Sequence, residues 1–175
     1  MFGPKLPKVL TKAQLDRLFE ACRAEPRLFI ESFLKIQTKT GKLIPFKLNS
    51  AQVYVYGIIM RLWRARKPVR IIILKARQMG ISTLIEALLF TMTVLNDNTN
   101  SIVVSHLKES SERIFRMSEL FLDNLPEQIA PMVRHRTKSL IRFENPEDNL
   151  RRDNPGRRSQ IQIATAKNPD VGASF

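Results

Sequence analysis

The fold class is decided by the stretch VRIIILKARQMGIST, which runs from Val69 to Thr83. Residues 69–74 form a β-branched run with little alternation between polar and apolar side chains, which predicts a central parallel strand covered on both faces. A short loop over residues 75–80 then leads into an apolar helix, which we expect to run from Ser82 to Leu95. A buried strand, a tight turn and a helix N-terminus, in this order, are the parts of a phosphate-binding loop.

The residues that follow repeat this order of elements. Residues 101–105 read as a second buried strand, and residues 107–125 read as a long amphipathic helix. Residues 139–143 and 160–164 then predict an antiparallel hairpin around an exposed, Arg-rich loop. The alternation of strands and helices predicts an α/β fold with a doubly wound, parallel core sheet, to which the hairpin is added.

The residues before the loop predict helices. Thr11 and Gln14 have the spacing of a capping box, and Asn49 or Ser50 is a second candidate helix cap. Residues 43–46 read as an extended or turn segment between helices. The helices predicted here begin after Thr11 and end near residue 25, follow an apolar stripe over residues 28–36, and run from residue 50 to about residue 66.

The loop departs from the usual G-x-x-x-x-G-K-[ST] pattern, because Lys75 stands at the first glycine position and Ile81 at the lysine position. The chemical groups that a phosphate-binding loop needs are still present. Gly80 permits a close backbone approach and Ser82 stands where a hydroxyl would bind Mg²⁺. Lys75 can supply the displaced ammonium, and Arg77 can stabilise charge that develops on a γ-phosphate. An ordinary strand-to-helix turn explains the same pattern, and the spacing alone leaves that alternative open.

Residues 75–83 resemble the Walker A loop of phage terminase large subunits, through Arg77-Gln78-Met79-Gly80 followed by Ser82. Residues 45–52 resemble the segment by which those motors hold adenine, where the amide of Gln52 can pair with both a donor and an acceptor of the base. The similarity in element order runs from roughly residue 27 to residue 165. It implies a P-loop NTPase-like sheet with flanking helices. The nucleotide-binding residues that it implies are Phe46, Gln52, Lys75, Ala76, Arg77, Gln78, Met79, Gly80, Ile81, Ser82 and Thr83, with Lys75 and Arg77 as catalytic residues and Ser82 as the Mg²⁺ ligand.

The resemblance implies an ATPase that uses ATP and Mg²⁺ to move double-stranded DNA into a capsid. Its expected partners are a terminase small subunit, a portal protein and further copies in a ring, in the cytoplasm of an infected bacterial host. We expect residues 1–45 to form an N-terminal helical segment and residues 46–175 to form a partial ATPase domain. The family's Walker B strand, catalytic glutamate and nuclease domain are not recognised in the sequence, so the expected hydrolysis by this chain alone is poor.

The charge of the chain favours polyanionic partners. It has 29 Lys and Arg against 16 Asp and Glu, a formal net charge of +13. The longest aliphatic run, residues 71–74, is too short to span a bilayer, so no membrane partner is expected. For the function of the chain, a helicase-like ATPase and a non-enzymatic basic DNA-binding module remain as alternatives. For the basic residues near the C-terminus, the alternative is a solvent-exposed loop without a binding partner. The two clusters predicted to grip DNA phosphates are Arg134, Arg136, Lys138 and Arg142, and Arg151, Arg152, Arg157 and Arg158.

Overall fold

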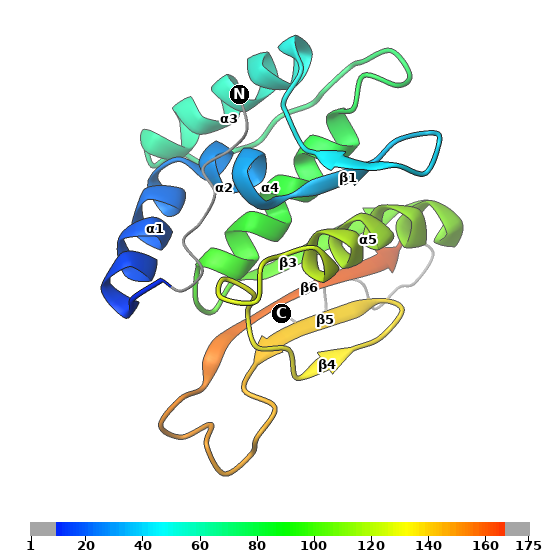
Figure 1. Cartoon of the computed structure of the whole chain (residues 1–175). Helices are drawn as coiled ribbons and strands as arrows, with labels where there is room; N and C mark the ends of the chain where they lie inside the picture. The colour runs from blue at the N-terminus through cyan, green and yellow to red at the C-terminus, as the bar shows by residue number, and fades with distance from the viewer. Residues whose placement is uncertain (1–9, 167–175) are drawn as a thin grey trace.

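The computed structural model describes residues 10–166, which form an α/β fold with five helices and two sheets (Figure 1). The larger sheet has the strand order β3-β6-β5-β4, and only its β3–β6 pair is parallel. A separate antiparallel pair, β1–β2, forms the smaller sheet, and Lys39 between these strands donates a hydrogen bond to Gln78 in the loop before α4. The elements in chain order are α1 (Lys12–Ala24), α2 (Pro26–Phe33), β1 (Lys35–Gln37), β2 (Leu43–Pro45), α3 (Ser50–Arg64), α4 (Ile81–Leu95), β3 (Asn100–Ser105), α5 (Lys108–Asp123), β4 (His135–Arg136), β5 (Leu140–Glu144) and β6 (Gly156–Thr165).

The N-terminal helices follow their local signals closely. Thr11 and Gln14 form the predicted capping box at the start of α1, and Pro26 begins α2 directly after α1 ends. The predicted second helix is too long, because α2 ends at Phe33 and Ile36 lies in β1 instead. Ile36 pairs with Ile44 of β2, so an interaction with a strand distant in sequence overrides the helical pattern.

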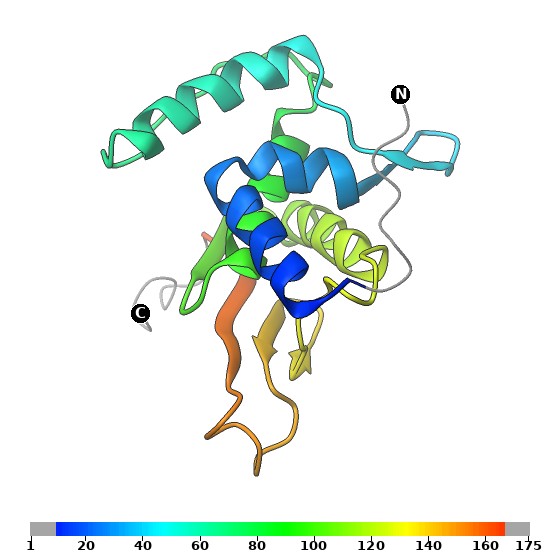
Figure 2. The same cartoon turned by 60° about the vertical axis from the view of Figure 1, so that its left-hand side comes forward.

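The two predicted strands of the hairpin and the strand after α4 are confirmed as β5, β6 and β3. β6 lies at the centre of the sheet: Ile161 pairs with Ile141 of β5 on one side and with Ser101 of β3 on the other. Figure 2 shows the hairpin extending away from the helices. The α/β class is therefore confirmed, but the described sheet is mixed and has one parallel pair rather than a parallel core.

The predicted central strand over residues 69–74 is wrong for the described structure. The run forms no strand, and its backbone makes no hydrogen bond with the backbone of another described residue. Ile72 and Leu74 are 93% and 96% exposed, whereas Ile73 faces a hollow shared with α3 and α4. In Figure 1 the run is part of the plain connection between α3 and α4. β-Branched residues form a strand only beside a partner strand, and no described strand lies beside this one.

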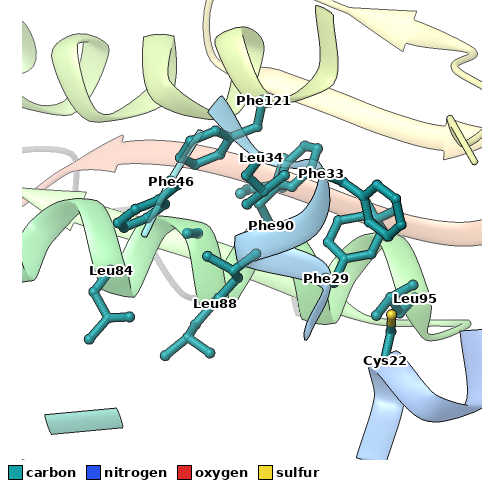
Figure 3. Packing of buried hydrophobic residues seen from close by; sticks show 14 of the residues in the cluster. Cys22, Phe29, Phe33, Leu34, Phe46, Leu84, Leu88, Phe90, Leu95 and Phe121 are labelled. Carbon is teal, nitrogen blue, oxygen red and sulfur yellow. The ribbon is translucent and has the colours of Figure 1, made fainter. Parts of the chain in front are cut away.

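α4 occupies the centre of the hydrophobic core (Figure 3). It packs against α1, α2, α3 and α5 and against the sheet strands β3 and β6. Phe90 on α4 lies 5.6 Å from Phe121 of α5, measured between ring centroids, and the rings of Phe29 and Phe33 on α2 contact each other at 5.4 Å. Because this core also includes Cys22 of α1, the N-terminal helices and the sheet share one apolar interior.

One charged side chain lies inside this core. Glu86 of α4 is 1% exposed, and the hydroxyl of Ser118 on α5 donates a hydrogen bond to its Oε1 atom at 2.6 Å. Its Oε2 atom has no hydrogen-bond partner among the described residues. Burial raises the pKa of Glu86 to about 7, although the hydrogen bond from Ser118 acts in the opposite direction. The neutral carboxyl group is therefore favoured in the folded protein below about pH 7.

Replacing this buried carboxyl group should change how stability depends on pH. Because the pKa of Glu86 is higher in the folded chain, its contribution to stability is full below about pH 4.5 and is lost as the pH rises to about 7. Glu86→Gln should remove this loss, as measured by urea unfolding from pH 4 to pH 8. Glu127→Gln, at an exposed site, is the control and should keep the wild-type profile. Parallel profiles for wild type and Glu86→Gln would contradict the prediction.

Candidate nucleotide-binding site

The loop before α4 forms a turn with left-handed backbone at two positions. Gln78 has φ 64° and Gly80 has φ 73°, and Gly80 is the N-cap residue of α4. No side chain caps this helix end. The N–H groups of the first turn of α4 therefore point outward without a side-chain acceptor, at the positive end of the helix dipole.

The turn is held against α3 by two polar side chains. The Nε2 atom of Gln52 donates to the carbonyl oxygen of Gly80 at 2.8 Å, and its Oε1 atom accepts from the Asn49 backbone N–H at 2.9 Å. The side chain of Asn49 donates to the Met79 carbonyl oxygen at 3.4 Å and also caps α3. Gln52 is 3% exposed, so both ends of its amide are already used inside the protein. This pair is called the Gln52 clasp below.

The charged residues predicted for the loop are accessible. Lys75 and Arg77 are exposed, and neither forms an ion pair with another described residue. Lys75 lines a hollow of about 280 Å³ between the loop and α3, whose other lining is almost entirely apolar. Gln78 is exposed and accepts a hydrogen bond from Lys39 at 3.2 Å. Lys75 and Arg77, which have no ion-pair partner among the described residues, therefore precede the uncapped N-terminus of α4 by a few residues in the sequence.

The first turn of α4 divides its side chains between the core and solvent. Ile81 is 4% exposed, Thr83 is half-buried, and Ser82 is exposed. Ala76 is also exposed. The hydroxyl predicted to bind Mg²⁺ thus faces solvent beside the turn.

Phe46, predicted to take part in nucleotide binding, lies elsewhere. Its ring is 1% exposed and lies in the core near Leu84 (Figure 3), and its backbone N–H donates to the Leu34 carbonyl oxygen at 2.9 Å. The structure therefore brings together Gln52, Met79 and Gly80, but it leaves Phe46 enclosed by apolar side chains, where a base cannot stack on it.

Most arginines of the two predicted DNA-gripping clusters are paired with acidic groups. Lys138, Arg152 and Arg158 are the members without an ion-pair partner in the described part of the chain. Asp123, at the end of α5, is exposed, and the hydrogen bond from Arg136 lowers the pKa of its carboxyl group. The pairs are Arg134 with Glu144 and Asp148, Arg136 with Asp123 and Glu119, Arg142 with Glu144, Arg151 with Asp148, and Arg157 with Asp97.

Two features of the surface were missed from sequence. The Asn49-x-x-Gln52 spacing is itself a capping-box signal. It could have predicted that Gln52 bonds the N-terminus of α3, a structural role that needs no adenine. Residues 61–70, at the end of α3, contain five cations and no acid, and the described side chains there are exposed apart from Leu62. This run carries more unpaired positive charge than the hairpin clusters do.

Comparisons with known proteins do not identify the chain. It matches no protein-family model, and a search of curated proteins finds no match. Among the described helices, none is long and apolar enough to cross a membrane. A proposal for its function therefore rests on its own residues and their geometry.

The left-handed backbone at Gly80 predicts a specific sensitivity to substitution. A Cβ atom there would lie 2.7 Å from Nε2 of Gln52, and φ 73° disfavours any side chain. Gly80→Ala should destabilise the protein by at least about 1 kcal/mol in urea unfolding. Gly57→Ala, on the exposed face of α3 with nothing within 4 Å, is the matched control and should stabilise the chain by about 0.5–1 kcal/mol. Equal effects at both glycines would show that the turn is not constrained.

Proposed function

We propose that the chain is the ATP-binding portion of a viral DNA-packaging motor, a terminase large subunit that couples ATP hydrolysis to translocation of double-stranded DNA. The observation that carries this proposal is the left-handed turn at Gln78 and Gly80, which leads into the uncapped N-terminus of the buried helix α4. Backbone N–H groups at such a helix end bind phosphate oxygens, and the helix dipole favours their negative charge.

The side chains around the turn fit a nucleotide with its metal ion. Lys75 supplies a mobile ammonium in the role of the lysine that Ile81 cannot fill, and Arg77 supplies a planar guanidinium for the γ-phosphate. Ser82 presents an exposed hydroxyl as a Mg²⁺ ligand. When bound, Mg²⁺ neutralises charge on the phosphates and orients them. All three side chains are exposed in the described structure, so each of them is accessible to a nucleotide.

Adenine recognition by Gln52 is coupled to the turn in this proposal. Because the amide is buried and already bonds the Gly80 carbonyl oxygen and the Asn49 N–H, it has to rotate or release one of these bonds before both its oxygen and its nitrogen can face a base. Release of the Gly80 carbonyl oxygen leaves the turn held to α3 by the hydrogen bond from Asn49 to the Met79 carbonyl oxygen, so occupancy of the adenine site and the shape of the phosphate turn change together. Phe46 contributes by packing beneath the segment that leads into α3, because its ring is buried.

The remainder of the proposed fold depends on residues 69–74. Their unpaired backbone and the exposed Ile72 and Leu74 offer an edge on which a further strand can pair, and that pairing would convert the run into a core strand of a P-loop sheet. We assign no catalytic acid in this chain, so hydrolysis by this chain alone is slow in the proposal. The proposed partners of the whole motor are a small subunit, a portal protein and neighbouring copies in a ring.

A non-enzymatic DNA-binding module is the second candidate. It is favoured by the engagement of Gln52 in the clasp and by the enclosed ring of Phe46, since both residues then have complete structural roles without a nucleotide. This candidate predicts DNA binding without magnesium-dependent affinity for ATP.

Removing the two loop cations should separate these candidates. Lys75→Ala and Arg77→Ala should each weaken binding of Mg²⁺·ATP, because each removes a positive charge placed for the phosphates. Isothermal titration calorimetry with and without Mg²⁺ measures the effect, and we expect about a tenfold loss of affinity per variant, since a hydrogen bond to a charged group contributes roughly 1.5–3 kcal/mol.

Lys138→Ala and Arg152→Ala are matched controls, because each removes an exposed, unpaired cation far along the chain from the loop. These controls should bind Mg²⁺·ATP like the wild type. Wild-type affinity in both loop variants, or no binding of ATP by the wild-type chain, would reject the nucleotide site and favour the non-enzymatic module.

A further inference from the structure

A basic and aromatic surface lies at the C-terminal end of α3, at the other end of that helix from the Gln52 clasp. Its residues are Trp63, Arg64, Arg66 and Lys67 of α3 and the following turn, together with Arg23 of α1, and it is called the α3 patch below. These five side chains, with Ala24 and Pro68, line an open hollow of about 750 Å³. The hollow is thus lined by four cationic side chains and one indole.

Part of this charge is already balanced and part is not. Arg64 forms an ion pair with Glu25, which also accepts a hydrogen bond from the hydroxyl of Tyr56, and Arg23 donates to the Leu95 carbonyl oxygen at 2.7 Å. Arg66 and Lys67 are exposed and have no ion-pair partner among the described residues. Arg61 and Arg70 flank them in the sequence, so the patch carries a net positive charge.

Arg66 occupies a backbone position that favours glycine. Its φ is 52°, and it ends α3 in a Schellman motif in which its N–H donates to the Trp63 carbonyl oxygen and the Lys67 N–H donates to the Leu62 carbonyl oxygen. A left-handed conformation is costly for arginine and nearly free for glycine. The fold therefore does not require an arginine at this position, and the side chain is exposed and free of an ion pair with any described residue.

Trp63 gives the patch a flat apolar surface. It is 49% exposed and is the only tryptophan of the chain. An exposed indole beside unpaired cations offers stacking to a base and ion pairing to the phosphates on either side of it.

We propose that the α3 patch binds a single-stranded segment of nucleic acid, with phosphates on Arg66 and Lys67 and an unpaired base stacked on Trp63. Bases inside a duplex are not free to stack on a side chain, whereas every base of a single strand is. The patch lies about 22 Å from the clasp, the length of the 15 residues of α3. The inference therefore stands on different residues from the nucleotide site and does not rest on the proposed function.

The fluorescence of Trp63 reports directly on this contact. Titration of the 175-residue protein with oligothymidylate, without ATP, should quench the emission, because the stacked base contacts the only indole. Inorganic polyphosphate should compete for the cations without quenching. The affinity for the oligonucleotide should fall steeply with salt, with a log–log slope of about −0.7 for each phosphate contacted.

Arg66→Gly separates a binding role from a structural one. This variant relieves the left-handed strain, so its thermal midpoint should equal or exceed that of the wild type, while its affinity for fluorescein-labelled oligothymidylate should fall about threefold or more in anisotropy titrations. Lys12→Ala is the control: Lys12 is an exposed cation at the start of α1 and has no ion-pair partner among the described residues. It should keep wild-type affinity.

Two substitutions test the stacking contact in the same assay. Trp63→Ala should lower the affinity about five- to hundredfold, and Trp63→Phe should restore part of it. The proposal is overturned if oligothymidylate binds without quenching Trp63, if Arg66→Gly and Lys12→Ala weaken binding equally, or if vesicles with anionic lipids quench Trp63 and oligothymidylate does not. The last result would assign the patch to a membrane surface.

Discussion

The enclosure of α4 is the constraint on which the rest of the structure depends. This helix packs against four other helices and two strands, and its buried side chains extend from Ile81 at its first residue to Leu95 at its last. Because the whole length of the helix is buried by its neighbours, its N-terminus has a defined place, and so does the turn that precedes it. The uncapped N-terminus of such a helix, with Ser82 exposed beside it, is suited to holding an anion without rearrangement of the core.

The clasp extends this constraint to α3. Gln52 and Asn49 tie the carbonyl groups of Met79 and Gly80 to the N-terminus of α3, so the position of α3 depends on the turn and the turn depends on α3. The C-terminus of the same helix carries the α3 patch. α3 thus lies between two surfaces suited to negatively charged partners. At its N-terminus it contacts the turn before α4, and at its C-terminus it carries the basic residues beside Trp63.

Local signals predicted much of the fold. The capping box placed the start of α1, the candidate caps Asn49 and Ser50 placed the start of α3, the apolar stripe placed α5, and strand patterns placed β5 and β6, because these signals depend on residues near each other in sequence. Residues 69–74 could not be predicted in the same way, since a strand also needs a neighbour. β1 was missed for the related reason that three residues form a strand only because β2 pairs with them.

The site was less predictable than the fold. Lys75 and Arg77 are accessible as expected, but the residue types alone did not indicate that Gln52 is already hydrogen-bonded at both ends of its amide or that Phe46 is buried. The ion pairs that neutralise the hairpin arginines join residues up to 60 positions apart, so the basic clusters looked more available in sequence than they are. The strain at Arg66 is visible only in the backbone.

In the proposed nucleotide site, the turn before α4 receives the phosphates. Backbone amide chemical shifts, followed by NMR while Mg²⁺·ATP is added to the ¹⁵N-labelled chain, measure this contact at each residue. We expect saturable shifts that are largest at Gly80, Ile81, Ser82 and Thr83, with a smaller change in the Gln52 side-chain amide. Unchanged resonances at these positions in a folded sample at saturating nucleotide, or shifts confined to another surface, would contradict it.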